Sequence, residues 1–319
     1  MPESPAGPVR VAVVGTGSVG ATFAYALLFS GLGAEIVLIN RDRDKAEGEA
    51  MDLTHAVPFT YPTRIWAGDY PDCAGAAITV LTAGAAQGDN DSRLDLVEKN
   101  GAIFQEIVPE VVRHNPDGIL LVATNPVDAL AYVAWRLSGL PPERVIGSGT
   151  ILDTARFWAL LGEHFRVDPN SIYADIIGEH GDSEVPVWSR ASIAGMSLPA
   201  YCAAHGMTHD EAALAEIFRH TRDAAKEVVE RKGATYYAVA AGMMRIVEAI
   251  LRDQRTVLPV SSLVQDYHGI DDIYLSLPCV VGRKGIEQVI RLDLGDDELE
   301  GLHRSAAILK EATAKLDLG

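Results

Sequence analysis

The chain has 319 residues, of which 48% are hydrophobic and 7% aromatic, enough to build sizeable cores and to exclude wholesale disorder. Its 27 basic and 44 acidic residues give a formal net charge of −17, which disfavours binding to nucleic acids and to anionic membrane surfaces. The three cysteines, Cys73, Cys202 and Cys279, form neither a disulfide framework nor a zinc pattern. We therefore expect a reducing, cytoplasmic environment and no metal site.

The stretch 11–34 is uncharged and long enough to cross a bilayer, which takes roughly 20 residues. Five glycines divide it into pieces that fit a strand, a turn and a helix, so we predict no transmembrane helix. Residues 1–10 lack the basic and apolar regions of a secretory signal.

The first half of the chain alternates short apolar runs with helical stretches. The runs show no apolar–polar alternation, as expected for parallel strands covered on both faces. Strands are predicted at 9–14, 35–39, 64–67, 77–81, 118–123 and 144–147, and helices at 21–30, 42–55, 94–115 and 128–137. This alternation predicts an α/β fold with an open, doubly wound parallel sheet.

After about residue 150 the pattern changes to that of an α+β domain. Helices are predicted at 152–165, from about 208 to 231, at 235–251 and at 296–316, with strands at 276–281 and 289–292. Thr208 and Glu211 are predicted to form the capping box of the second of these helices. The sequence thus predicts two domains, residues 1–150 and 151–319.

A glycine-rich turn follows the first predicted strand and opens the first helix. Gly15, Gly17 and Gly20 stand there in the pattern G-x-G-x-x-G. In this pattern the glycines allow a tight turn, close approach of a pyrophosphate to the backbone, and close packing of helix on strand. No Lys-Ser/Thr follows the last glycine, so a nucleoside-triphosphate P-loop is excluded. The context predicts a Rossmann-type dinucleotide-binding domain.

The residue expected to hold the adenosine ribose departs from the usual pattern. An acidic residue is typical about 20 positions after the glycines, but the second strand ends here in Asn40, followed by Arg41. An amide can bond a ribose diol, yet it does not repel a 2′-phosphate. We expect NADPH to be less strongly excluded than usual, with NADH preferred because no other phosphate pocket is evident.

Four polar segments interrupt the predicted core. A glycine-bounded loop ends at Arg93, Asn125 follows the fifth strand, Asp153 and Arg156 share a helix face, and His180 stands between two glycines. Taken singly, Asp153 and Arg156 could be a plain helix salt bridge, and a lone histidine is more often packed than catalytic. Behind a dinucleotide cradle, the four segments together predict an active site.

Six segments make the sequence recognisable: VAVVGTGSVG, TAGAAQGDNDSRLDL, VATNPVD, GSGTILDTARF, GEHGDSEVPVWS and KGATYYAVA. With them the chain resembles the L-lactate/malate dehydrogenase family, most closely its bacterial L-lactate dehydrogenases, from about Val11 to the last helix. The resemblance implies an NAD-dependent 2-hydroxy-acid oxidoreductase that interconverts pyruvate and L-lactate in glycolysis. It also implies a cytoplasmic homotetramer.

The resemblance assigns roles to the polar segments. His180 would be the acid/base, with a pKa near neutrality, and Asp153 would fix its tautomer and stabilise the imidazolium. Arg156 would clamp the substrate carboxylate, and Arg93 would polarise the carbonyl. These residues form the predicted catalytic centre.

Further residues follow from the same resemblance. Asn125 and Thr235 would line the space between nicotinamide and substrate. Gln87, which malate-specific relatives replace by arginine, would favour pyruvate over oxaloacetate. The predicted cofactor-binding residues are Gly15, Gly17, Ser18, Val19, Gly20, Asn40, Thr82, Ala83, Gly84 and Asn125.

Three other functions compete with this one. A malate dehydrogenase of the same family would need a cation for the second carboxylate of oxaloacetate. A non-catalytic, NAD-responsive binding protein would not need the predicted pair of His180 and Asp153. A nicotinamide-using glycosidase is disfavoured because no Cys/His metal cluster is present in the sequence.

Regulation by fructose 1,6-bisphosphate is also open to prediction from the resemblance. Relatives that this effector activates bind it through an arginine and a histidine whose positions are Trp158 and Tyr173 here, with Asp175 nearby. Uncharged rings and a carboxylate do not offset the desolvation of a bisphosphate. We therefore expect no activation by this effector.

Overall fold

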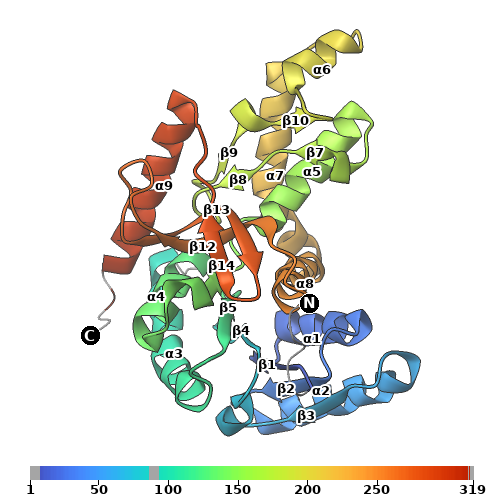
Figure 1. The fold of residues 1–319 in the computed structure, drawn as a ribbon, viewed down its shortest axis with the longest axis vertical. Helices are drawn as coiled ribbons and strands as arrows, with labels where there is room; N and C mark the ends of the chain where they lie inside the picture. Colours follow the sequence, from blue (N-terminus) through green and yellow to red (C-terminus); the bar gives the residue numbers. More distant parts are fainter. Residues whose placement is uncertain (1–7, 86–92, 315, 317–319) are drawn as a thin grey trace.

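A parallel sheet forms the centre of the molecule in this computed structural model, which describes residues 8–85, 93–314 and 316 (Figure 1). Its six parallel strands lie in the order β3-β2-β1-β4-β5-β6. They are β1 (Arg10–Val14), β2 (Glu35–Ile39), β3 (Arg64–Ala67), β4 (Ile78–Leu81), β5 (Ile119–Val122) and β6 (Val145–Gly147). This is the Rossmann strand order, and the predicted strands are confirmed to within one residue at each end.

Helices cover both faces of this sheet, as the uninterrupted apolar runs predict. They are α1 (Ser18–Ser30), α2 (Arg43–Ala56), α3 (Arg93–His114) and α4 (Val127–Ser138). Val11 and Val13 of β1 face the core under α1 and α2, whereas Ala12 and Val14 face the core under α3 and α4. Successive residues of a strand therefore serve opposite layers.

The second half of the chain extends the same sheet. Strands β12 (Thr256–Val264), β13 (Ile273–Gly282) and β14 (Gly285–Val289) add an antiparallel edge, with β12 next to β6. The sequence did not predict β12, and the strand predicted at 289–292 is wrong, because β14 ends at Val289. The extension joins the second half to the parallel sheet.

Most of the remaining elements of the second half form the upper part of Figure 1. The remaining elements are α5 (Ile151–Phe165), α6 (Leu198–Ala204), α7 (Glu211–Lys232), α8 (Tyr237–Leu251), α9 (Asp296–Ala314), β7 (Ile172–Tyr173), β8 (Ile176–Ile177), β9 (Val185–Pro186), β10 (Ser192–Ile193) and β11 (Met196–Ser197). Of these, α8 lies lower, next to α1. Helix α7 is capped by Asp210, whose carboxylate accepts from the backbone N–H groups of Ala212 and Ala213 at 3.0 and 3.1 Å. The predicted cap, Thr208, is therefore wrong, because an Asp at the position adjacent to the helix takes that role.

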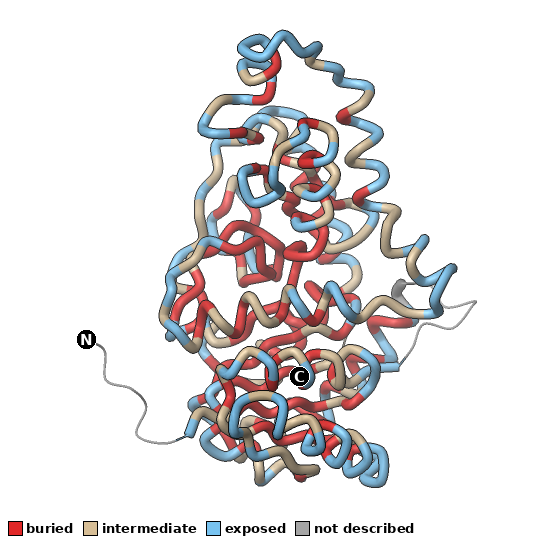
Figure 2. Tube along the Cα trace, turned by 90° about the vertical axis from the view of Figure 1, so that its right-hand side faces the viewer, coloured by how far each residue is buried: buried red, intermediate tan, exposed pale blue. Residues whose placement is uncertain are grey.

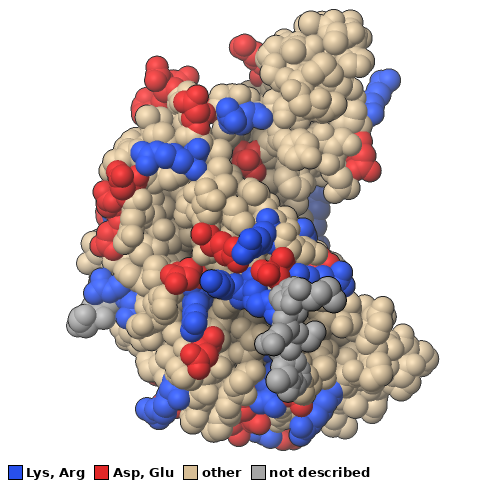
Figure 3. All heavy atoms as spheres, in the orientation of Figure 1, with Lys and Arg blue, Asp and Glu red and all other residues tan. Residues whose placement is uncertain are grey.

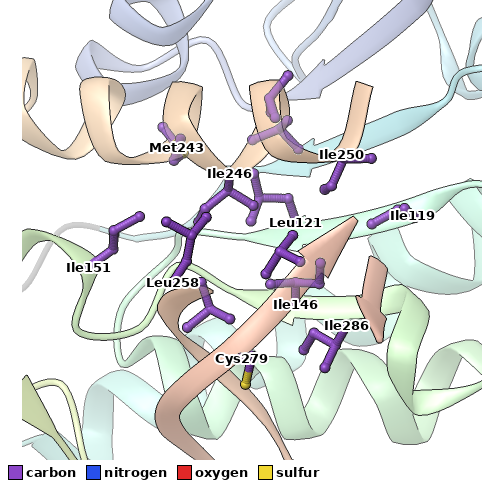
Figure 4. Close-up of a cluster of buried hydrophobic side chains, with 14 of the residues drawn as sticks. Ile119, Leu121, Ile146, Ile151, Met243, Ile246, Ile250, Leu258, Cys279 and Ile286 are labelled. Atoms are coloured by element: carbon purple, nitrogen blue, oxygen red, sulfur yellow. The ribbon is translucent and has the colours of Figure 1, made fainter. Parts of the chain in front are cut away.

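Helix α8 ties the two halves together. Its side chains Met243, Ile246 and Ile250 lie over Leu121 of β5 and Leu258 of β12 (Figure 4). Figure 2 shows buried segments running through the middle of the molecule.

Charged side chains of both signs are interspersed on the face drawn in Figure 3. Within the described part of the chain, no helix combines the length and the apolar character that a membrane span requires.

Candidate active site

The glycine turn between β1 and α1 has the shape that a dinucleotide needs. Gly15 has a φ of +104°, and a side chain there would overlap the backbone of Ala83. A Cβ on Gly20 would overlap the carbonyl oxygen of Gly15, whereas one on Gly17 meets nothing within 4 Å. The turn is thus packed on its inner side and open at Gly17, where a pyrophosphate can approach the backbone beside Ser18 and Val19.

The segment after β4 lies against this turn. The Thr82 hydroxyl donates to the carbonyl oxygen of Gly15 at 2.6 Å, and the Ala83 N–H donates to that of Val14 at 2.9 Å. The Thr124 hydroxyl in turn donates to the Ala83 carbonyl at 2.8 Å, and its methyl group leaves no room for a side chain on Gly84. The structure therefore brings the predicted cofactor residues Thr82, Ala83 and Gly84 to one edge of the sheet.

Asn125 is held at the same edge by Asn100 of α3. The Asn100 amide donates to the carbonyl oxygen of Asn125 at 2.8 Å, while its own oxygen accepts from the N–H of Ala85 at 2.7 Å. The side chain of Asn125 is exposed, so it can reach a ligand lying over the strand ends.

His180, Asp153 and Arg156 form one hydrogen-bonded cluster. The two oxygens of Asp153 face different partners: Oδ2 lies 2.5 Å from His180 Nδ1, and Oδ1 accepts from Arg156 Nη1 at 2.9 Å. Only 3% of the Asp153 side chain is exposed, against 23% of His180. The buried carboxylate thus fixes the His180 ring and the Arg156 guanidinium, both of which remain partly accessible to a ligand.

Charge pairing shifts the pKa values of the pair. Burial alone would raise the pKa of Asp153, but the charges of His180 and Arg156 and the hydrogen bond to His180 hold it below its usual range. Burial likewise opposes protonation of His180, but the Asp153 charge and hydrogen bond, with the charges of Asp128 and Glu184, raise its pKa to about 9. The predicted value near neutrality is therefore too low, and His180 carries its proton at pH 7.

Asp128 of α4 positions the loop that carries His180, a role that the sequence did not reveal. It is 1% exposed, and its carboxylate accepts from the backbone N–H of His180 at 2.7 Å and from the Ser276 hydroxyl at 2.8 Å. Burial raises its pKa. The backbone of Gly178 pairs with Ser276 of β13, and Gly178 has a φ of +93° that favours glycine. An acidic residue in the first turn of a helix usually indicates only a dipole interaction, so the sequence held no distinct signal.

Glu184 is a second acidic residue that sequence reasoning missed. It is 7% exposed, and its Oε1 has no hydrogen-bond partner among the described residues. Burial and then the charge of Asp153 raise its pKa to about 8, so the neutral acid predominates at pH 7. A neutral Glu184 adds no negative charge beside His180 and Arg156, which favours an anionic ligand.

Comparisons with known proteins decide the family. Residues 9–147 match the NAD binding domain of lactate/malate dehydrogenase, and residues 150–317 match its alpha/beta C-terminal domain. The chain belongs to the lactate/malate dehydrogenase family. As a member it is an NAD-dependent oxidoreductase, and the glycine turn described above fits that cofactor.

Relatives of this chain are similar to it over nearly their full length. An L-lactate dehydrogenase of Acetivibrio thermocellus is 49% identical over 309 residues, covering 97% of this chain and 98% of the relative. One of Moorella thermoacetica is 49% identical over 313 residues, with 98% and 99% covered. The solved minor L-lactate dehydrogenase of Enterococcus mundtii has a TM-score of 0.94 at 39% identity, with 98% and 99% covered.

The other predicted site residues of this family member are placed less fully. Thr235 lies half-buried in the turn between α7 and α8. Arg93 is the first residue of α3, but its side chain lies outside the described part of the chain, as does all of Gln87. No group of three or more His, Cys, Asp or Glu side chains that could hold a metal ion is present among the described residues.

Proposed function

We propose that the chain is an L-lactate dehydrogenase that reduces pyruvate with NADH and catalyses the reverse reaction. The observation that carries this proposal is the His180–Asp153–Arg156 cluster, in which the backbone N–H of His180 also donates to Asp128, in the first turn of the helix that follows β5. The cluster holds a proton donor and a carboxylate-binding cation side by side. The names of the similar bacterial proteins support the same substrate.

Reduced nicotinamide, when bound, supplies a hydride to the carbonyl carbon of pyruvate. Arg156 binds the pyruvate carboxylate with the donors that do not face Asp153. His180 places its Nε2 proton on the carbonyl oxygen, because Nδ1 faces Asp153, and Asp153 stabilises the imidazolium until that transfer. Arg93 polarises the carbonyl, and Asn125 and Thr235 line the space beside it. Addition of one hydride and one proton converts pyruvate to lactate.

Product analysis tests this proposal. Purified protein with NADH and pyruvate should yield one lactate per NADH oxidised, and a stereospecific assay should identify it as the L-enantiomer. Formation of D-lactate or oxidation of NADH without lactate would contradict it.

Gln87 is proposed to select pyruvate over oxaloacetate. A neutral amide leaves the second carboxylate of oxaloacetate without a cation, and an unpaired buried charge costs about 2–5 kcal/mol, or tens- to thousands-fold in discrimination. We expect Gln87→Arg to reverse the preference, measured as the ratio of kcat/KM for the two oxo acids. A ratio unchanged by the substitution would show that Gln87 does not select between the two oxo acids.

We propose that fructose 1,6-bisphosphate does not regulate this enzyme. Trp158 Nε1 donates to the carbonyl oxygen of Ala174 at 2.6 Å, so this ring is fixed against β7, and Tyr173 is 68% exposed. Burial raises the pKa of Asp175 to about 6, so it is largely anionic at pH 7 and repels phosphate. Pyruvate saturation curves should be identical with and without the sugar bisphosphate. A clear fall in KM on its addition would overturn this expectation.

A homotetramer is proposed from the family resemblance. Large apolar side chains are exposed on α1, α2 and the short turn Val57–Phe59 that follows, which supports self-association of this region: Tyr25, Phe29, Met51 and Phe59. A cytoplasmic location and a role in glycolysis stay predictions.

A further inference from the structure

The turn between β2 and α2 differs from a strict NAD site in its residue types and in its charge. In Rossmann domains, an acidic residue at the end of this strand bonds the adenosine ribose 2′-hydroxyl, whereas a nearby arginine accommodates a 2′-phosphate. Here the strand is followed by Asn40 and Arg41, and Lys45 stands in the first turn of α2. No carboxylate takes the ribose-binding position.

Two hydrogen bonds place this turn beside the glycine loop. The N–H of Gly15 donates to the carbonyl oxygen of Ile39 at 2.8 Å, and Asn40 Nδ2 donates to the Thr16 hydroxyl at 2.6 Å. A ribose attached to a pyrophosphate at Gly17 therefore lies next to Asn40. The Asn40 oxygen also accepts from the N–H of Asp42 at 3.1 Å, so this neutral side chain is held between the two loops.

The nearby acidic side chains are largely engaged elsewhere. Asp42 accepts from the backbone N–H of Lys45 at 3.2 Å and caps α2, and Asp69 pairs with Arg43 at 3.0 Å. Arg43 also pairs with Glu47 at 2.9 Å. Asp44 is exposed in the first turn of α2. Asp69 and Glu47 thus pair with Arg43 rather than with Arg41 or Lys45.

Arg41 and Lys45 keep their side-chain charges available. Both are exposed, and neither side chain has an ion pair or hydrogen bond with another described residue. Arg41 directly follows Asn40 and carries the planar donor set that binds phosphate oxygens in pairs. Lys45, four residues later in the first turn of α2, contributes a second positive charge to this segment.

We propose that Arg41 and Lys45 bind the 2′-phosphate of NADPH, so that this enzyme uses NADPH as well as NADH. The inference rests on the proposed function only for the position of the dinucleotide, not for the identity of the oxo acid. It adds Lys45 as a phosphate partner to the expectation from the sequence that NADPH is less strongly excluded than usual.

Dinucleotide binding without an oxo acid tests the proposal, with nicotinamide fluorescence as the readout. In the wild type we expect dissociation constants for NADPH and NADH within about tenfold of each other. Arg41→Ala should weaken NADPH binding by about fivefold or more and leave NADH binding unchanged, because a charge-assisted contact to the 2′-phosphate is lost. Asn40→Asp should weaken NADPH binding and strengthen NADH binding. Arg304→Ala, which removes another exposed arginine on α9, is the control and should change neither constant.

The outcomes separate this proposal from the proposed function. Equal effects of Arg41→Ala on the two dinucleotides, or NADPH binding more than about 100-fold weaker than NADH binding in the wild type, overturn the 2′-phosphate site alone. Failure of both dinucleotides to bind the wild type overturns the proposed function as well. High salt should weaken NADPH binding more than NADH binding, because the additional contact is between exposed charges.

Discussion

Replacing His180 by Asn is expected to lower kcat for pyruvate reduction by about 10²- to 10⁴-fold, the usual contribution of a positioned general acid. Asn retains a polar group of similar reach but cannot give a proton to the carbonyl oxygen. Steady-state rates with NADH measure the effect, and NADH binding should stay close to that of the wild type. His303→Asn, which changes an exposed histidine on α9, is the matched control and should leave kcat unchanged. A His180→Asn variant that retains more than about a tenth of wild-type kcat would contradict the role of His180 as the proton donor.

The pH dependence of pyruvate reduction should follow the protonation of His180. Reduction needs the imidazolium, so kcat/KM should be constant below the pKa of about 9 and fall as the pH rises through it. Asp153→Asn removes the charge that raises this pKa, so the fall should move to lower pH and the maximal rate should decrease. An unshifted pH profile in Asp153→Asn would show that Asp153 does not act through His180.

Arg156→Lys is expected to reduce kcat/KM for pyruvate by about 30- to 5,000-fold, because weakening a buried charge pair costs about 2–5 kcal/mol. Arg156 is 15% exposed and directs one nitrogen at Asp153, so its remaining donors form a fixed fork for the substrate carboxylate. Lysine supplies a single ammonium that cannot bond Asp153 and both carboxylate oxygens in the same geometry. Most of the loss should be an increase in KM.

A second arginine–carboxylate pair provides the control for this substitution. Arg219 and Glu216 share the same spacing on α7 but are about half exposed. Arg219→Lys should leave kcat/KM within about twofold of the wild type, since exposed pairs contribute little. Equal effects of Arg156→Lys and Arg219→Lys would show that the Asp153–Arg156 pair is an ordinary helix salt bridge without a role in substrate binding.

The parallel sheet could be predicted closely from the sequence, whereas its antiparallel extension could not. Runs such as that of β5 are apolar throughout because helices cover both of their faces. Strand β12 contains Pro259, Ser261 and Ser262, residues that usually argue against a central strand. Pro259 nonetheless lies opposite Pro278 of β13, so the pairing of the two strands accommodates residues that break a local pattern.

The site residues that carry a local signal in the sequence were easier to predict than those whose role depends on contacts between distant segments. Asp153 and Arg156 share a helix face, and His180 stands in a distinctive glycine-flanked segment. Asp128 lies 52 residues before His180 and contacts it only because β13 brings the loop to the start of α4. Glu184 has its raised pKa because of burial, which single-sequence reasoning does not reveal.

The rates of NADH oxidation with pyruvate and with oxaloacetate, at equal concentrations and with the wild-type protein, test the proposed function most directly. A neutral Gln87 and a carboxylate-binding Arg156 predict that kcat/KM for pyruvate is at least tens of times that for oxaloacetate. The reason is that leaving the second carboxylate of oxaloacetate unpaired costs about 2–5 kcal/mol. Turnover of oxaloacetate as fast as pyruvate would instead indicate a malate dehydrogenase. NADH binding without oxidation in the presence of either oxo acid would indicate a non-catalytic binding protein and contradict the account.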